Sequence, residues 1–161
     1  MSAEGITAIC SMLIAGTALI ISLWQGAVSR THNRLSVRPS LMFDIVVVKA
    51  QPPAQIVLRN ASIGPAFLKD FRVTLDNKST PCKTPADWDR ILTDLGIETP
   101  RVESTYLDPS GTIAPNEKIL ILRFHTQEDP VITLEKLQRL NIEVVYKSAY
   151  KEQFTATLKS S

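Results

Sequence analysis

The stretch that decides the architecture of this chain is Gly5–Ser29, GITAICSMLIAGTALIISLWQGAVS, which contains no Asp, Glu, Lys, Arg or His. An α-helix rises about 1.5 Å per residue, so about twenty apolar residues cross a hydrocarbon core about 30 Å thick. Trp24 lies near one end of the stretch, where an amphipathic ring favours the membrane interface. The stretch therefore predicts one N-terminal transmembrane helix.

Two other interpretations of this stretch are weaker. A cleaved secretory signal has a basic segment before a shorter apolar core, whereas residues 1–4 carry no Lys or Arg, although Ala27–Ser29 has the small residues of a cleavage site. A buried helix of a soluble protein is disfavoured, because a chain of 161 residues hardly buries a helix that is apolar on every side.

The residues that follow the apolar stretch predict its orientation. Arg30, Arg34 and Arg38 come directly after it, and the four residues before it contain no Lys or Arg. Basic residues beside a membrane span are retained on the cytoplasmic side. We therefore expect a single-pass protein with its N-terminus outside and its C-terminal domain in the cytoplasm.

A basic collar beside the span is the first candidate site. The collar consists of three arginines and a histidine at the level of the lipid headgroups. It either only enforces the topology of the span, or it has a second role as well. That role is to bind anionic lipid or a phosphorylated ligand, or to sense pH through the histidine. The collar residues are Arg30, His32, Arg34 and Arg38.

A helix-pairing face is the second candidate site. Small residues at four-residue spacing let two helix backbones approach closely. The residues with this spacing are Ala18, Ser22 and Gly26. They favour self-association or contact with a partner's helix, although small residues are common in any span.

The charge distribution argues against nucleic acid as a partner. The chain has 18 Lys+Arg and 16 Asp+Glu, but from Pro39 onward it has fifteen of each, so the surplus belongs to the collar. Nucleic-acid binding requires a surplus of basic groups over a face of the domain. Cys10 in the span and Cys82 in the domain cannot pair, and a domain without a disulfide is consistent with a reducing cytoplasm.

The remainder of the chain predicts one β-rich domain. We assign residues 1–29 to the anchor, 30–40 to a basic connector and 41–161 to the domain. Alternating or continuous apolar runs between turn residues predict about seven short strands, which favours an immunoglobulin-like antiparallel β-sandwich, with a small β-barrel as the alternative. The predicted strands are 41–49, 55–59, 67–75, 103–107, 118–125, 141–146 and 153–158.

A short helix is predicted between the strands at Thr84–Gly96. Thr84 can cap it, Pro85 suits its first position and Gly96 can end it. Its apolar residues recur at helical spacing, so we expect one face to lie on the sheet; they are Trp88, Ile91, Leu92 and Leu95. A second helix of one or two turns is expected from Thr133 to Leu140.

Two motifs carry a resemblance to a known group of proteins. His32–Pro39, HNRLSVRP, follows the span, and Asn60–Ala66 has the pattern N-x-x-x-G-P-A, a turn in which we expect Gly64 to permit positive φ. The chain thus resembles small uncharacterised bacterial membrane-anchored proteins with one N-terminal span. The resemblance implies a location in the inner membrane and no established activity.

We find no catalytic, cofactor or metal site in the sequence. The cysteines and histidines are too scattered for a structural zinc site, and no glycine-rich phosphate loop or nucleophile elbow is present. Cys82 and His125 are a weak candidate pair for thiolate chemistry. A group of acidic residues is a weak candidate for a divalent cation: Asp87, Asp89, Asp94, Glu98 and Glu103.

The sequence therefore predicts a membrane-anchored, non-enzymatic interaction module. Its partners are expected to be the lipid bilayer and a membrane or cytoplasmic protein, or a second copy of the chain, because sheet edges are ready docking sites. The alternative is a membrane-tethered sensor that binds a small ligand or a lipid headgroup.

Overall fold

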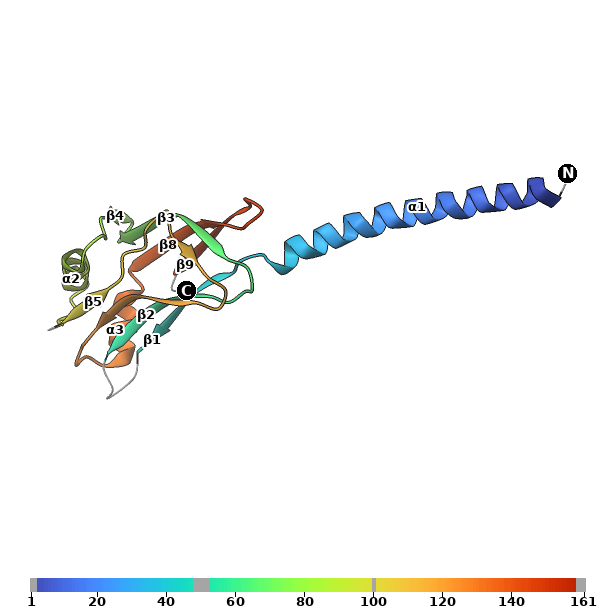
Figure 1. Cartoon of the computed structure of the whole chain (residues 1–161). Helices are drawn as coiled ribbons and strands as arrows, with labels where there is room; N and C mark the ends of the chain where they lie inside the picture. Colours follow the sequence, from blue (N-terminus) through green and yellow to red (C-terminus); the bar gives the residue numbers. More distant parts are fainter. Residues whose placement is uncertain (1–2, 48–52, 100, 159–161) are drawn as a thin grey trace. The chain divides into compact units, whose positions relative to one another are not determined.

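The computed structural model describes residues 3–47, 53–99 and 101–158. The contacts between residues divide the chain into two compact units, Met1–Ser36 and Val37–Ser161. The first unit contains one long helix and the second contains all the strands (Figure 1).

Helix α1 (Ala3–Ser36) has no buried residue, and its large apolar side chains are exposed. Several of its hydroxyl groups are satisfied within the helix: those of Thr7, Thr17 and Ser22 each donate to the carbonyl oxygen four residues earlier, at 2.8–3.0 Å. The predicted helix is therefore present. It continues through most of the segment 30–40 and ends before Pro39, because a residue that precedes proline disfavours helical φ and ψ.

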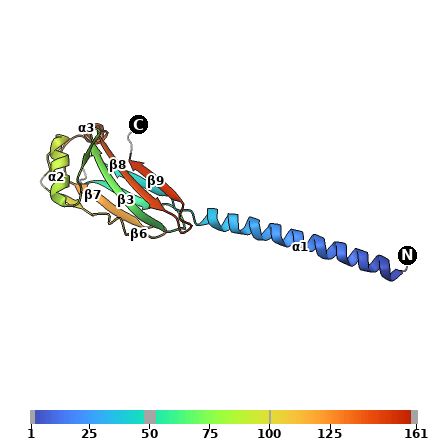
Figure 2. The ribbon, with the colours of Figure 1, turned by 90° about the horizontal axis from the view of Figure 1, so that it is seen from above.

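The second unit consists of two antiparallel sheets. The first has the order β1 (Leu41–Val46), β2 (Ala54–Asn60), β7 (Lys118–Phe124) and β5 (Val102–Ser104). The second has the order β4 (Lys78–Thr80), β3 (Ala66–Leu75), β8 (Leu140–Lys147) and β9 (Gln153–Leu158), with β6 (Thr112–Ile113) also paired to β3. Figure 2 shows β3, β8 and β9 running side by side. The described strands thus form two sheets with edges, and not the closed sheet of a barrel.

Apolar side chains of both sheets form one core. Strand β2 buries every second residue, including Ile56 and Leu58, because successive side chains of a strand point to opposite faces. Leu122 and Phe124 of β7 and Ile142 of β8 are fully buried in the same cluster. Burial of this apolar surface is the dominant force that holds the two sheets together.

The structure has a strand in each predicted region and adds two. The predicted strand 103–107 is shorter than expected, because β5 ends at Ser104. The predicted strand 41–49 ends at Val46 in β1, and its residues Val48 and Lys49 lie outside the described part of the chain. The additional strands, β4 and β6, are only three and two residues long. They are too short to show an alternating sequence pattern, and they form by pairing with the long strand β3.

Helix α2 (Pro85–Asp94) has the predicted ends. Thr84 caps it, and Asp87 completes a capping box in which its carboxylate accepts from the Thr84 backbone N–H at 2.9 Å. Trp88, Ile91 and Leu92 are buried, and Gly96 ends the segment with a φ of +71°, a conformation that favours glycine.

Helix α3 (Pro130–Leu137) begins earlier than predicted. Asp129, not Thr133, is its cap, and the Asp129 carboxylate accepts from the Val131 backbone N–H at 2.9 Å. Thr133 is instead a fully buried residue inside the helix. Asp129 directly precedes Pro130, and proline suits the first position of a helix. The Asp–Pro pair therefore sets the start of α3, and Thr133 does not.

We predict that Asp87→Asn makes the domain less stable at neutral pH than at acid pH, relative to the unmodified chain. Hydrogen bonds from the Lys83 N–H, the Thr84 hydroxyl and the Thr84 N–H lower the pKa of Asp87. Its contribution is therefore fully present above the pKa of an unfolded aspartate, about 4, and is lost as pH falls through the lower folded value.

The measurement is urea unfolding of the full chain in detergent at several pH values, in a Trp24→Phe background so that buried Trp88 reports on the domain. Asp89→Asn, on the same helix but outside the capping box, is the control. An identical pH dependence for the two variants would contradict the role assigned to Asp87.

Candidate membrane span, collar and entry joint

The structure divides the predicted collar between the two units. Arg30, His32 and Arg34 lie on the last turns of α1, where they are exposed. Arg38 lies in the second unit, after the helix has ended. The collar is therefore one helical cluster of two arginines and a histidine, followed by an arginine that belongs to the folded domain.

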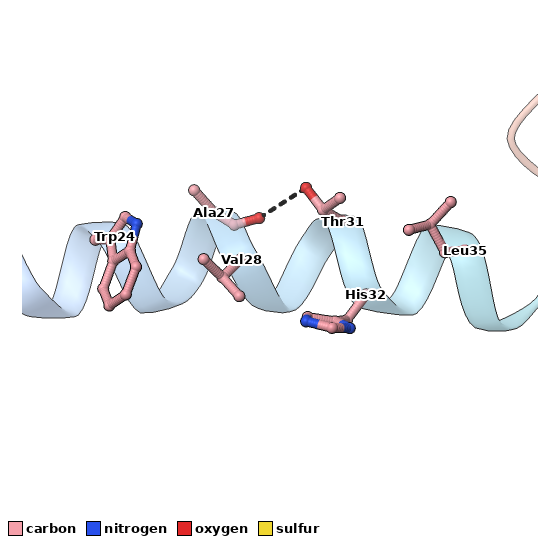
Figure 3. Close-up of a pocket in the computed structure, with 6 residues that line it drawn as sticks. All are labelled: Trp24, Ala27, Val28, Thr31, His32 and Leu35. Atoms are coloured by element: carbon pink, nitrogen blue, oxygen red, sulfur yellow. Dashed lines mark hydrogen bonds between the residues drawn. The ribbon is translucent and has the colours of Figure 1, made fainter.

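A strip of apolar and aromatic side chains leads along α1 to His32. Figure 3 shows Trp24, Val28 and His32 along one side of the helix, with the Thr31 hydroxyl donating to the Ala27 carbonyl oxygen at 3.1 Å on the other side. These residues and Leu35 line a shallow hollow on the helix surface. An indole followed by an imidazole two helical turns later matches the change from hydrocarbon to headgroups at a membrane interface.

The candidate pairing face is open in the isolated chain. The Ser22 hydroxyl donates to the Ala18 carbonyl oxygen at 2.8 Å. The hydroxyl therefore points along its own helix and not outward. A Cβ added to Gly26 would meet no atom within 4 Å, so the fold of this chain does not itself require a glycine there. Further small residues precede this candidate face at spacings of three and four: Ala8, Ser11 and Ala15.

Residues 37–41 pack into the domain at a place that we call the entry joint. The joint consists of residues 37–41, the turn 60–64, and Tyr146 and Phe154. The Ala61 N–H donates to the Ser40 carbonyl oxygen at 2.8 Å, and the Ser40 N–H donates to the Ser62 hydroxyl at 3.2 Å. The segment that follows α1 is thus hydrogen-bonded to the turn after β2.

Gly64 is required at the entry joint by close packing. A Cβ at this position would overlap the backbone carbonyl of Val37. Our expectation that Gly64 adopts positive φ is wrong, because among the described glycines only Gly96 does so. The glycine of the N-x-x-x-G-P-A motif therefore lets two backbone segments come into contact.

Asn60, the first residue of the same motif, connects three chain segments. It is fully buried. Its Nδ2 donates to the carbonyl oxygens of Gly64, Ile113 and Ala114 at 2.8–3.3 Å, and its Oδ1 accepts from the Ser62 hydroxyl at 2.8 Å. Because a buried amide without partners costs about 1–3 kcal/mol, this network specifies the conformation of the turn.

Arg38 has a partner within the domain. Its guanidinium carbon lies 4.4 Å from the centre of the Phe154 ring, a cation–π geometry worth about 0.5–1 kcal/mol at an exposed site. Phe154 in turn packs against Tyr146, with ring centres 5.6 Å apart, and the Tyr146 hydroxyl accepts from the Leu41 N–H at 3.3 Å. Arg38 therefore helps to hold the entering segment on β8 and β9, a role that sequence reasoning missed.

Three of the weak candidates for chemistry, Cys82, Asp87 and Glu103, have structural roles in this fold. Cys82 is buried in the core, and burial, with the nearby charge of Asp87, raises its pKa to about 12. Its thiol is thus protonated at neutral pH and is a poor nucleophile. Asp87 caps α2, while Glu103 pairs with Arg101 and Arg123 at 2.9 and 3.1 Å. Across residues 3–47, 53–99 and 101–158, no three His, Cys, Asp or Glu side chains gather as a metal site would require.

A family model matches most of the chain. A family model described as a domain of unknown function (DUF8453) matches residues 6–160, which include α1 as well as both sheets. A comparison with curated proteins finds no match.

We predict that Gly64→Ala destabilises the domain by about 1–3 kcal/mol, the usual cost of forcing a methyl group into a closely packed site. The measurement is urea unfolding of the full chain in detergent, followed by Trp88 fluorescence in the Trp24→Phe background. Gly16→Ala is the matched control, because a Cβ at Gly16 meets no atom within 4 Å. Equal stability of the two variants would show that the contact between Val37 and Gly64 does not hold the entry joint.

Proposed function

Because the chain belongs to the family described as a domain of unknown function (DUF8453), which names no activity, we propose a function from its own residues. The protein is a single-pass membrane protein whose folded domain is a non-enzymatic interaction module, held at the membrane by α1. The observation that carries this proposal is the apolar surface of α1: no residue of this helix is buried by the part of the chain that the structure describes.

The exposed side chains of α1 support a bilayer as its environment. Met12 is 79% exposed, Ile14 71% and Ile20 69%, and apolar surface costs about 25 cal/mol per Å² in water. The most apolar window of α1 has a mean hydropathy of 2.2, and within the described residues α1 is the one helix long and apolar enough to cross a membrane. An uninterrupted helix also satisfies the backbone polar groups that lipid cannot.

The basic residues support a domain in the cytoplasm and an N-terminus outside. Arg30 and Arg34 lie on α1 directly after its apolar part, and Arg38 follows within the domain. Arginines this close to a span are retained on the cytoplasmic side. In a bacterial cell, the membrane concerned is the inner membrane.

The strand order supports an immunoglobulin-like sandwich. In that fold one sheet has the order A-B-E-D and the other contains C-F-G, with C′ added beside C in variable-type domains. When the strands are lettered along the chain, β1-β2-β7-β5 corresponds to A-B-E-D, and β4-β3-β8-β9 to C′-C-F-G. The fold alone does not specify a function, but it is compatible with binding at edges and loops.

Several features of the domain favour binding over catalysis. Three of the residues weighed for chemistry, Cys82, Asp87 and Glu103, serve the core, a helix cap and ion pairs respectively. Meanwhile apolar side chains of α3 remain exposed, among them Val131 and Ile132, and β9 is an edge strand of its sheet. These surfaces and the small-residue face of α1 are where a protein partner or a second copy would bind.

We predict that the full chain stays in the membrane fraction after alkaline extraction, because α1 is integrated in the bilayer. A fluorescent protein fused to its C-terminus fluoresces, whereas alkaline phosphatase fused there is inactive, since the domain is in the cytoplasm. Arg30→Gln with Arg34→Gln weakens this orientation. A chain that remains dispersed without detergent, or an active phosphatase fusion in the unmodified chain, refutes the proposal.

We also predict that Ala18→Leu reduces association between spans, measured as energy transfer between labelled chains in vesicles. A larger side chain separates backbones that small residues bring together. Ala27→Leu is the matched control, because nine residues along an α-helix place Ala27 about half a turn away from Ala18. If neither or both substitutions change the energy transfer, Ala18, Ser22 and Gly26 are not the pairing face.

A further inference from the structure

One end of the domain carries exposed apolar side chains beside basic ones. We call it the entry pole; it consists of segments 37–40, 61–65, 114–118 and 147–152 together with Phe67. Hydrogen bonds and strand pairing bring these segments together: Ala61 bonds to Ser40, Asn60 to Ala114, and Phe67 is opposite Lys147. Figure 1 shows the tip between β8 and β9 at the end of the domain where its chain begins, and α3 at the other end.

The apolar residues of the entry pole are held in exposed positions. Ile63 is 64% exposed and Tyr150 is 49% exposed, and Phe67 is also open to solvent. The turn between β8 and β9 carries Tyr150 and is hydrogen-bonded: the Tyr150 N–H donates to the Ser148 hydroxyl at 3.2 Å and the Lys151 N–H to the Ser148 carbonyl oxygen at 2.9 Å. Tyr150 is therefore exposed on a turn with a defined backbone conformation.

The charge of the entry pole is positive, although the domain as a whole is neutral. Its acidic residues are Glu117 and Glu152, and the Glu117 carboxylate is engaged by the Ala114 N–H at 2.6 Å. Its basic residues are Arg38, Lys118, Lys147 and Lys151. A neutral domain that concentrates cations and apolar rings at one end has the composition of a surface that binds anionic lipid.

The length of α1 brings this end of the domain within reach of lipid headgroups. The apolar stretch ends at Ser29 and the helix at Ser36, which is about 10 Å further along a helix. Val37, the next residue, packs against Gly64 of the entry pole. The headgroup region extends about 5–8 Å beyond the hydrocarbon on each side, so the entry pole begins close to it.

We propose that the entry pole docks onto the surface of the bilayer that α1 crosses, and that its ligand is anionic phospholipid. Ile63, Phe67 and Tyr150 enter the interface, while Lys147 and Lys151 bind lipid phosphates. This inference rests on the proposed membrane location of α1. Docking fixes the orientation of the domain, so that α3 and the far end of the sheets point away from the membrane toward a partner.

The test uses the full chain with Cys10→Ser, since Cys10 is exposed whereas Cys82 is buried. A polarity-sensitive fluorophore is attached at Ile63→Cys or at Ile132→Cys, and the protein is reconstituted in vesicles of phosphatidylcholine with or without phosphatidylglycerol. Ile132 is the matched control, an isoleucine 49% exposed on α3 at the opposite end. Headgroup spin labels on the lipid quench a fluorophore that touches the surface.

With phosphatidylglycerol present, we expect the label at residue 63 to be quenched at least about twofold more than the label at residue 132, because it lies in the interface. Lys147→Gln with Lys151→Gln, or vesicles of phosphatidylcholine alone, should remove most of this difference, because each lysine contributes to electrostatic binding. Equal quenching at the two positions overturns the proposal.

Flotation of the same samples separates this inference from the proposed function. A protein that does not float with the vesicles refutes the membrane location of α1 and the docking together. A protein that floats while residues 63 and 132 are quenched equally leaves the span intact and refutes only the docking of the entry pole. Preferential quenching that is independent of anionic lipid refutes the assignment of phosphatidylglycerol-type lipid as the ligand.

Discussion

The placement of this protein depends on one constraint, which is that no residue of α1 is buried by the described part of the chain. A helix of 34 residues without a buried side chain gains nothing from the core that stabilises the two sheets. Its backbone is internally hydrogen-bonded, so lipid can surround it without leaving polar groups unpaired. The proposed location and tethering of the domain follow from placing this surface in a bilayer, and its proposed orientation follows from the arginines beside it.

The entry joint fixes the first residues of the domain. Residues 37–41 are bonded to the turn after β2 and packed against β8 and β9. Gly64 allows the backbone contact, Asn60 fixes the turn, and Arg38 rests on Phe154. The asparagine and glycine of the N-x-x-x-G-P-A motif thus have a physical role, which is to hold the turn after β2 against the first residues of the domain.

The sequence predicted the elements whose signals are local. The alternation in β3 and the capping residues of α2 repeat within a few positions, and both elements lie where we expected them. Strands β4 and β6 were missed because two or three residues carry no period and become strands only beside β3. The contact of Arg38 with Phe154 joins the two ends of the domain's sequence, and no local pattern can predict it. The close contact between Gly64 and Val37 could not be predicted for the same reason: the sequence shows the glycine but not which distant backbone segment packs against it.

The central claim, that α1 crosses a bilayer, is tested most directly by amide hydrogen exchange along the helix in lipid nanodiscs. Amides in a hydrocarbon core are inaccessible to water, whereas those of a helix in solution open and exchange. We predict strong protection from Ile9 to Gly26, with a sharp change to rapid exchange between Thr31 and Ser36. Uniform, rapid exchange along the whole of α1 would contradict the account.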